Sequence, residues 1–135
     1  MTPEIDPRNS KKVLISSDQY LHGEMCSSIL SSCGLTVETH YDHQDALWNL
    51  LDEDESPCDF AVVDFPFQEA HRKDALELLQ QLKDKEIPTI VISSLGREEF
   101  AQLDLSVAAQ GFLSKPFSDQ AFEDAVSKII PPRKA

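Results

Sequence analysis

Four short apolar runs in the sequence each end on a polar residue, and this arrangement constrains the fold more than any other feature. The runs occupy residues 13–15, 60–63, 89–92 and 111–113, and they end at Ser16-Ser17-Asp18, at Asp64, at Ser93 and at Ser114-Lys115. Continuous apolar runs of this length are typical of parallel strands buried on both faces. Because ligand sites of open parallel sheets lie beyond the carboxyl ends of the strands, we expect these polar residues to meet at one edge.

Segments with helical spacing of apolar residues separate the strands. We predict strands over residues 12–16, 35–39, 60–64, 89–93 and 111–114, and helices over residues 20–33, 43–54, around 75–82, 97–109 and 119–130. Asp42 and Ser118 suit the N-caps of two helices, and Gly34 suits a left-handed C-cap. Five strands that alternate with five helices predict an α/β fold, a doubly wound parallel sheet with right-handed crossovers.

The length of 135 residues is that of one domain with a full core. We assign residues 11–130 to this domain, residues 1–10 to a flexible N-terminal lead-in, and residues 131–135, after the final helix, to a C-terminal tail.

The charge balance argues against two classes of partner. The formal net charge is −12, and this disfavours non-specific binding to nucleic acids and to anionic membranes, which both require a basic face. Three cysteines without a C-x-x-C pair, at positions 26, 33 and 58, are expected to be reduced thiols. With no signal-peptide pattern at the N-terminus, a cytoplasmic location is expected. The four histidines, which lack metal-ligand spacing, are expected at the surface; they are His22, His40, His43 and His71.

The strand-end residues suit phosphoryl chemistry when they are taken together. Asp18 and Asp64 would repel one another at adjacent strand ends, and Mg²⁺, which prefers oxygen ligands, relieves such repulsion. A carboxylate in such a site can attack phosphorus and form an aspartyl phosphate. The Lys115 ammonium would neutralise charge on the phosphoryl oxygens, and the Ser93 hydroxyl could donate to one of them.

Four segments together resemble the CheY-like receiver domain of two-component response regulators. They are residues 12–18 (KVLISSD), 59–64 (DFAVVD), 88–94 (PTIVISS) and 111–117 (GFLSKPF), and the resemblance covers about residues 11–130. It implies a flavodoxin-like fold with a five-stranded sheet. It also implies a magnesium-dependent reaction in which a sensor histidine kinase or a phosphotransfer protein donates a phosphoryl group.

The resemblance implies a role for particular residues at the phosphorylation site. Asp64 would accept the phosphoryl group and bind the metal, Asp18 would be the direct metal-binding acid, and Pro66 would offer its backbone carbonyl to the metal. Ser17 stands where receivers carry the first acid of an acidic pair, which should weaken Mg²⁺ binding. In receivers, positions near Pro66 and Leu95 tune the loss of the phosphoryl group, and because both residues are apolar here we expect a long-lived phosphorylated state.

The resemblance also implies a switch. Ser93 would be the switch hydroxyl and Lys115 the lysine that senses the phosphoryl group, with a cis peptide bond between Lys115 and Pro116. Phe112 matches the aromatic switch position, whose ring repacks when the hydroxyl moves. The face formed by the fourth helix, the fifth strand and the fifth helix would then bind a downstream protein or a second copy of the chain.

These expectations leave three functions open. The first is a phosphorylation-dependent receiver, which is not an enzyme beyond its own phosphorylation and dephosphorylation at Asp64. The second is a pseudo-receiver that binds proteins without phosphorylation, favoured by Ser17 and Pro66. The third is a small hydrolase with Ser17 or Ser93 as nucleophile, although no Gly-x-Ser-x-Gly motif supports it.

Overall fold

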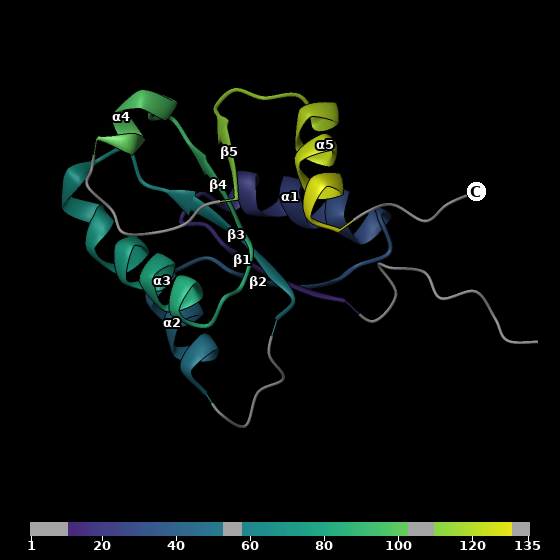
Figure 1. Ribbon diagram of the computed structural model, residues 1–135, viewed down its shortest axis with the longest axis horizontal. Coiled ribbons are helices and arrows are strands. Elements are labelled where there is room, and N and C mark those ends of the chain that lie inside the picture. The colour runs from purple at the N-terminus through teal and green to yellow at the C-terminus, as the bar shows by residue number, and fades with distance from the viewer. Residues whose placement is uncertain (1–10, 53–57, 103–109, 131–135) are drawn as a thin grey trace, which may run out of the picture.

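The computed structural model describes residues 11–52, 58–102 and 110–130, and its centre is one parallel sheet. The strand order is β2-β1-β3-β4-β5 (Figure 1). The strands are β1 (Lys12–Ser16), β2 (Thr36–His40), β3 (Phe60–Phe65), β4 (Thr89–Ser93) and β5 (Gly111–Ser114). This order and the parallel pairing confirm the predicted doubly wound fold.

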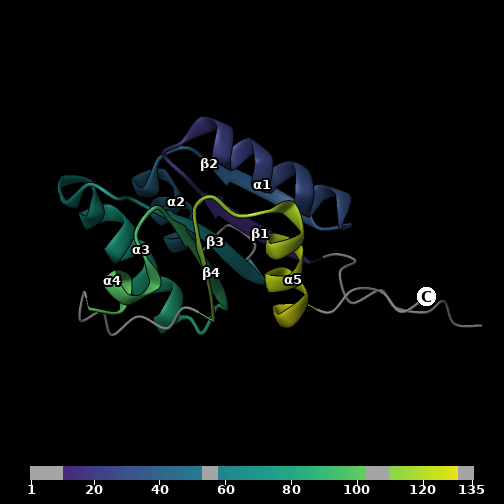
Figure 2. The same cartoon turned by 90° about the horizontal axis from the view of Figure 1, so that it is seen from above.

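Helices cover both faces of the sheet (Figure 2). They are α1 (Tyr20–Ser32), α2 (His43–Leu51), the 3-10 turn η1 (Glu69–His71), α3 (Arg72–Asp84), α4 (Arg97–Ala101) and α5 (Asp119–Ile129). Side chains of α1 and α5 pack on one face, and those of α2, α3 and α4 pack on the other. The sheet is therefore the middle of three layers.

Two hydrophobic clusters, one on each face, hold the layers together. Alternate side chains of β1 and β3 point to opposite faces, so each strand contributes to both clusters. Phe122 and Val126 of α5 are fully buried against one face. The apolar side of α3 is buried against the other face, as its spacing predicted, through Ala75, Leu78, Leu79 and Leu82.

The helix ends follow the predicted capping residues. Asp42 accepts a hydrogen bond from the Gln44 N–H at 2.8 Å, and Ser118 accepts one from the Ala121 N–H at 3.0 Å. Gly34, just after the C-cap of α1, has a φ of 88°, which a residue without a side chain adopts at little cost.

Some predicted bounds were wrong. The second strand lies over Thr36–His40, one residue later than expected. The helix expected over residues 43–54 ends at Leu51, because Asp52 turns to an extended conformation. The helix expected over residues 97–109 is helical over Arg97–Ala101, and residues 103–109 lie outside the described part. The predicted lead-in and tail, residues 1–10 and 131–135, lie outside it as well.

The order of the strands places a crevice between β1 and β3. The chain leaves β1 toward β2 on one side, and β3 then joins β1 on its other side, so connections diverge at the carboxyl ends of β1 and β3. Doubly wound sheets bind ligands at such a point. In the described part of the chain, no helix is long and apolar enough to cross a bilayer.

Candidate functional site at the carboxyl edge of the sheet

Asp64 lies at the centre of this edge, near the end of the fully buried strand β3. Its neighbours along the strand are apolar, and the residue itself is only 2% exposed. A buried carboxylate is costly unless donors surround it, so the partners of Asp64 define the site.

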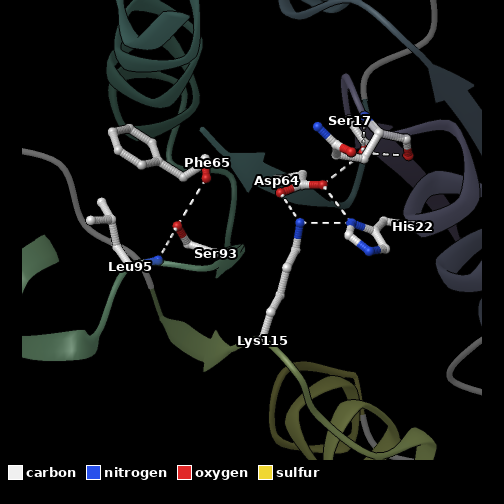
Figure 3. A network of polar contacts seen from close by, with 8 residues as sticks. Ser17, His22, Asp64, Phe65, Ser93, Leu95 and Lys115 are labelled. Atoms are coloured by element: carbon white, nitrogen blue, oxygen red, sulfur yellow. Dashed lines mark hydrogen bonds and ion pairs between the residues drawn. The ribbon is translucent and has the colours of Figure 1, made fainter. Parts of the chain in front are cut away.

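Both carboxylate oxygens of Asp64 receive hydrogen bonds (Figure 3). Lys115 Nζ, which reaches in from the end of β5, donates to Oδ1 at 2.7 Å. The Ser17 hydroxyl, just beyond β1, donates to Oδ2 at 2.8 Å. The bond between Lys115 and Pro116 is cis, as the resemblance implied. The structure therefore brings the strand-end residues of β1, β3 and β5 into direct contact.

The Ser93 hydroxyl is close to this network but does not belong to it. It donates to the Phe65 backbone carbonyl at 2.9 Å and accepts from the Leu95 N–H at 3.1 Å (Figure 3). Ser93 at the end of β4 is opposite Phe65 in the register, which explains this bond. The predicted switch hydroxyl is thus held by the main chain beside Asp64.

Phe112, the predicted aromatic switch residue, belongs to a series of ring contacts. Its ring centroid lies 5.1 Å from that of Phe100 on α4, and the Phe100 ring meets the Phe65 ring edge-on at 5.2 Å. Arg97 on α4 donates to the Phe112 carbonyl at 3.2 Å. Aromatic contacts therefore connect the residue after Asp64 with α4 and β5.

Asp18 and Pro66 were predicted as metal ligands. Asp18 is exposed and lines a cleft of about 640 Å³ together with Asp64 and Pro66. The Pro66 carbonyl accepts a hydrogen bond from Arg72 Nε at 3.2 Å, and the same guanidinium donates to the Phe67 carbonyl at 2.5 Å. Arg72 thus places a positive charge beside the carbonyl that was expected to face the metal.

The oxygen ligands present at this edge fit a weakly held magnesium ion. Mg²⁺ is usually bound through one or two carboxylates and retains several waters, and Asp18 and Asp64 provide two carboxylates in one cleft. Over residues 11–52, 58–102 and 110–130, no group of three or more His, Cys, Asp or Glu side chains is arranged to hold a metal ion. Ser17, which stands where the resemblance implies an acid, contributes a hydroxyl to this edge and not a third carboxylate.

The prediction that all four histidines lie at the surface was wrong for His43. His43 is 5% exposed, and its Nδ1 lies 2.6 Å from the Ser16 hydroxyl. Burial lowers the pKa of His43, although the charges of Asp18 and Asp64 act against this shift. Its position just after Asp42, at the start of α2, turns it toward the sheet rather than toward solvent.

His22 is a site residue that sequence reasoning missed. Its Nδ1 lies 2.7 Å from Lys115 Nζ and 3.6 Å from Asp64 Oδ2. A signal was present: position 22 falls in the first turn of a helix that begins at the carboxyl edge, one helical turn beyond Asp18. His22 does not itself end a strand, so the strand-end pattern does not indicate it.

The chain is similar to known proteins over most of its length. Residues 13–127 match the family described as "Response regulator receiver domain". The response regulator GtcR of Aneurinibacillus migulanus is 28% identical over 121 residues, which are 89% of this chain and 46% of that protein. The probable transcriptional regulator ycf27 of Guillardia theta is 28% identical over 128 residues, 94% of this chain and 48% of that protein. The chain thus spans about half the length of these relatives.

Solved structures share the fold. The chemotaxis protein CheY4 of Vibrio cholerae superimposes with a TM-score of 0.73 at 23% identity, over 90% of this chain and 99% of that one. A receiver domain protein of Methanospirillum hungatei gives a TM-score of 0.72 at 20% identity, over 89% and 93% of the two chains. These similarities confirm the flavodoxin-like fold that the resemblance implied.

Proposed function

The chain belongs to the response-regulator receiver domain family, and on this premise we propose that it signals through phosphorylation of Asp64. The observation that carries this proposal is the contact between Asp64 and Lys115, in which a buried carboxylate meets an ammonium at the carboxyl edge of the sheet. An ammonium in that position can neutralise charge on an incoming phosphoryl group.

The reaction is a transfer of a phosphoryl group between two side chains. Receiver domains interact with histidine kinases or phosphotransfer proteins, and we propose that such a protein carries the group on a histidine. An Asp64 oxygen forms a bond to phosphorus while the bond from phosphorus to the donor nitrogen breaks, and its electron pair remains on that nitrogen. Lys115 moves from the free carboxylate to an oxygen of the bound group.

Receiver domains generally bind Mg²⁺, and here Asp18 and Asp64 would hold it. When bound, the ion adds positive charge at the phosphoryl oxygens. The chain itself contributes the Lys115 ammonium, the Ser17 hydrogen bond that orients the carboxylate, and a cleft open enough to admit the donor.

The proposed signal is a change of surface on the β5 side of the molecule. We propose that a phosphoryl oxygen draws the Ser93 hydroxyl away from the Phe65 carbonyl, and that Phe112 then repacks against Phe100. The face of α4, β5 and α5 would bind its downstream protein, or a second copy of the chain, with altered affinity. Such a ligand-driven change is a shift between two conformations.

We propose no enzyme activity beyond the phosphorylation and dephosphorylation of Asp64. The two serines considered as hydrolase nucleophiles have other partners: Ser17 contacts Asp64, and Ser93 contacts main-chain groups. The Ser16 hydroxyl does contact His43, but Ser16 does not line the cleft that Asp64 lines.

A pseudo-receiver is the second candidate, and two contacts favour it. The Ser17 hydroxyl donates a hydrogen bond to one carboxylate oxygen of Asp64, and the Arg72 guanidinium donates one to the Pro66 carbonyl. A chain of this kind would bind its partner through the same fold without accepting a phosphoryl group.

Beryllofluoride, a phosphoryl mimic, discriminates between the two candidates. With Mg²⁺ present, we expect it to shift the NMR resonances of residues around Asp64 and Phe112. Asp64→Asn should abolish these shifts, whereas Asp45→Asn, at an exposed position on α2, should retain them. Absence of shifts in the unmodified chain, together with phosphorylation-independent partner binding, would instead establish the pseudo-receiver.

A further inference from the structure

His22 lies beside the acceptor carboxylate and has no role in the reaction described above. Its Nδ1 is 2.7 Å from Lys115 Nζ, and the ammonium has only donors to offer. Nδ1 is therefore an acceptor, and the ring proton of this imidazole belongs on Nε2. Figure 3 shows the ring directed at the ammonium from the side opposite Ser93.

The contact joins parts of the chain that are distant in sequence. His22 comes from the first turn of α1, and Lys115 lies 93 residues later, beyond β5. Gly23, next to His22, lies close to the end of β2, because a Cβ there would be 3.0 Å from the Tyr41 ring and 3.5 Å from the Thr39 side chain. The packing of α1 thus sets the position of the imidazole.

We propose that His22 is a positioning residue for Lys115, an inference that rests on the proposed role of Asp64. A lysine side chain has a flexible four-carbon stem and three rotatable donors, so one ion pair leaves its direction poorly defined. Two acceptors, Asp64 Oδ1 and His22 Nδ1, define it. When a phosphoryl group is attached to Asp64, His22 keeps one ammonium hydrogen engaged and the remaining donors are directed at the phosphoryl oxygens.

The burial of the three side chains agrees with this role. The Asp64 side chain is 3% exposed and that of Lys115 is 13% exposed, whereas the His22 side chain is 43% exposed. Asp64 and Lys115 form the buried pair, and His22 lies on the solvent side of this pair. A helix position that is only partly buried also tolerates substitution, so variants of His22 are expected to fold.

The test compares two substitutions of His22. His22→Asn retains an oxygen acceptor near the place of Nδ1, while His22→Leu removes the acceptor. We expect His22→Leu to slow phosphorylation of Asp64 by acetyl phosphate and Mg²⁺ by about tenfold to a hundredfold, the loss typical of a misplaced reacting group. His22→Asn should restore the rate to within about threefold of the unmodified chain. The matched control is His40→Leu, because His40 is a histidine on β2 that does not line the cleft, and it should leave the rate unchanged.

A second measurement separates this inference from the proposed function. The ¹⁵N resonance of the Lys115 ammonium should shift in His22→Leu and return toward its original position in His22→Asn, whether or not Asp64 is phosphorylated. In a Lys115→Met background, His22→Leu should have no further effect on the rate, because the two residues act as one unit. An unchanged Lys115 resonance in His22→Leu would overturn the inference, whereas failure of the unmodified chain to phosphorylate would overturn only the proposed function.

Discussion

The Ser93 hydroxyl donates to the backbone carbonyl of Phe65 at 2.9 Å, so the residue after Asp64 holds the proposed switch hydroxyl. The same oxygen accepts from the buried Leu95 N–H at 3.1 Å. Release of Ser93 toward a phosphoryl group therefore breaks a contact with the acceptor strand itself. The resting arrangement and the proposed switch compete for one hydroxyl.

Removal of the Ser93 hydroxyl should lower the stability of the fold and abolish the proposed switch, without preventing binding at Asp64. In Ser93→Ala the Leu95 N–H loses its partner, and a buried unsatisfied donor costs about 1–3 kcal/mol. We expect the free energy of unfolding in urea to fall by that amount. Beryllofluoride should still bind at Asp64, but the NMR resonances of the Phe112 ring should not move. Ser93→Thr, which retains a hydroxyl, is the control, and movement of the Phe112 resonances in Ser93→Ala would contradict the switch.

The affinity for magnesium should depend on position 17. Ser17→Asp adds a carboxylate beside Asp64 and Asp18, and the affinity of oxygen-ligand sites rises with the number of charged ligands. We expect the dissociation constant for Mg²⁺, measured by calorimetry, to fall about tenfold or more. Without the ion, the added charge next to Asp64 should destabilise the fold, and Mg²⁺ should restore stability by mass action.

The neutral variant Ser17→Asn provides the control for this experiment, because it has the size of aspartate without its charge. We expect it to bind Mg²⁺ no more tightly than the unmodified chain. Equal affinities of Ser17→Asp and Ser17→Asn would show that position 17 does not face the ion.

The strand-end residues could be predicted because the sheet places them without reference to side-chain detail. Asp64, Ser93 and Lys115 each lie at or just beyond the carboxyl end of an apolar strand, and parallel strands bring these ends to one edge. The register then determines which residues are neighbours, as Phe65 and Ser93 show. For these residues, the pattern of apolar runs in the sequence was sufficient to predict their place in the fold.

His22 and Arg72 could not be found in this way, because each depends on how a helix is docked. His22 reaches Lys115 only because α1 packs close to the sheet, and Arg72 reaches the Pro66 carbonyl only because η1 turns the chain back before α3. Neither residue ends a strand. The local geometry of the loop over residues 65–71 likewise follows from packing, including Arg72 over the Phe65 ring at 5.7 Å.

Two of the three free cysteines should resist alkylation in the folded chain. Burial raises the pKa of Cys26 to about 12 and that of Cys58 to about 11, and only the thiolate is nucleophilic. We expect iodoacetamide at pH 8 to label both residues far more slowly in buffer than in concentrated urea, as measured by mass spectrometry of peptides. Labelling of Cys26 in buffer at the rate seen in urea would show that α1 opens readily.

The stability of the fold should decrease as the pH falls below the ordinary pKa of histidine, because His43 is buried in its neutral form. Burial lowers its pKa from 6.5, an effect larger than the opposing influence of Asp18, Asp64 and Asp42. Its Nδ1 contacts the Ser16 hydroxyl, and its Nε2 has no hydrogen-bond partner among the described residues. Protonation in the folded state would place a charge in a buried position, and this cost outweighs the help of the nearby acidic residues and of the Asp64 backbone.

The sign follows from proton binding in the two states. At pH above 6.5 the imidazole is neutral in both states and contributes no pH dependence. As the pH falls through 6.5, the unfolded chain binds a proton that the folded chain does not, and the unfolding free energy decreases by at most about 1.4 kcal/mol per pH unit. Urea unfolding at pH 7.5, 6.5 and 5.5 measures this slope, and His43→Asn, which cannot titrate, should flatten it. An equal slope in both chains would assign the pH dependence to other groups and would contradict a neutral, buried His43.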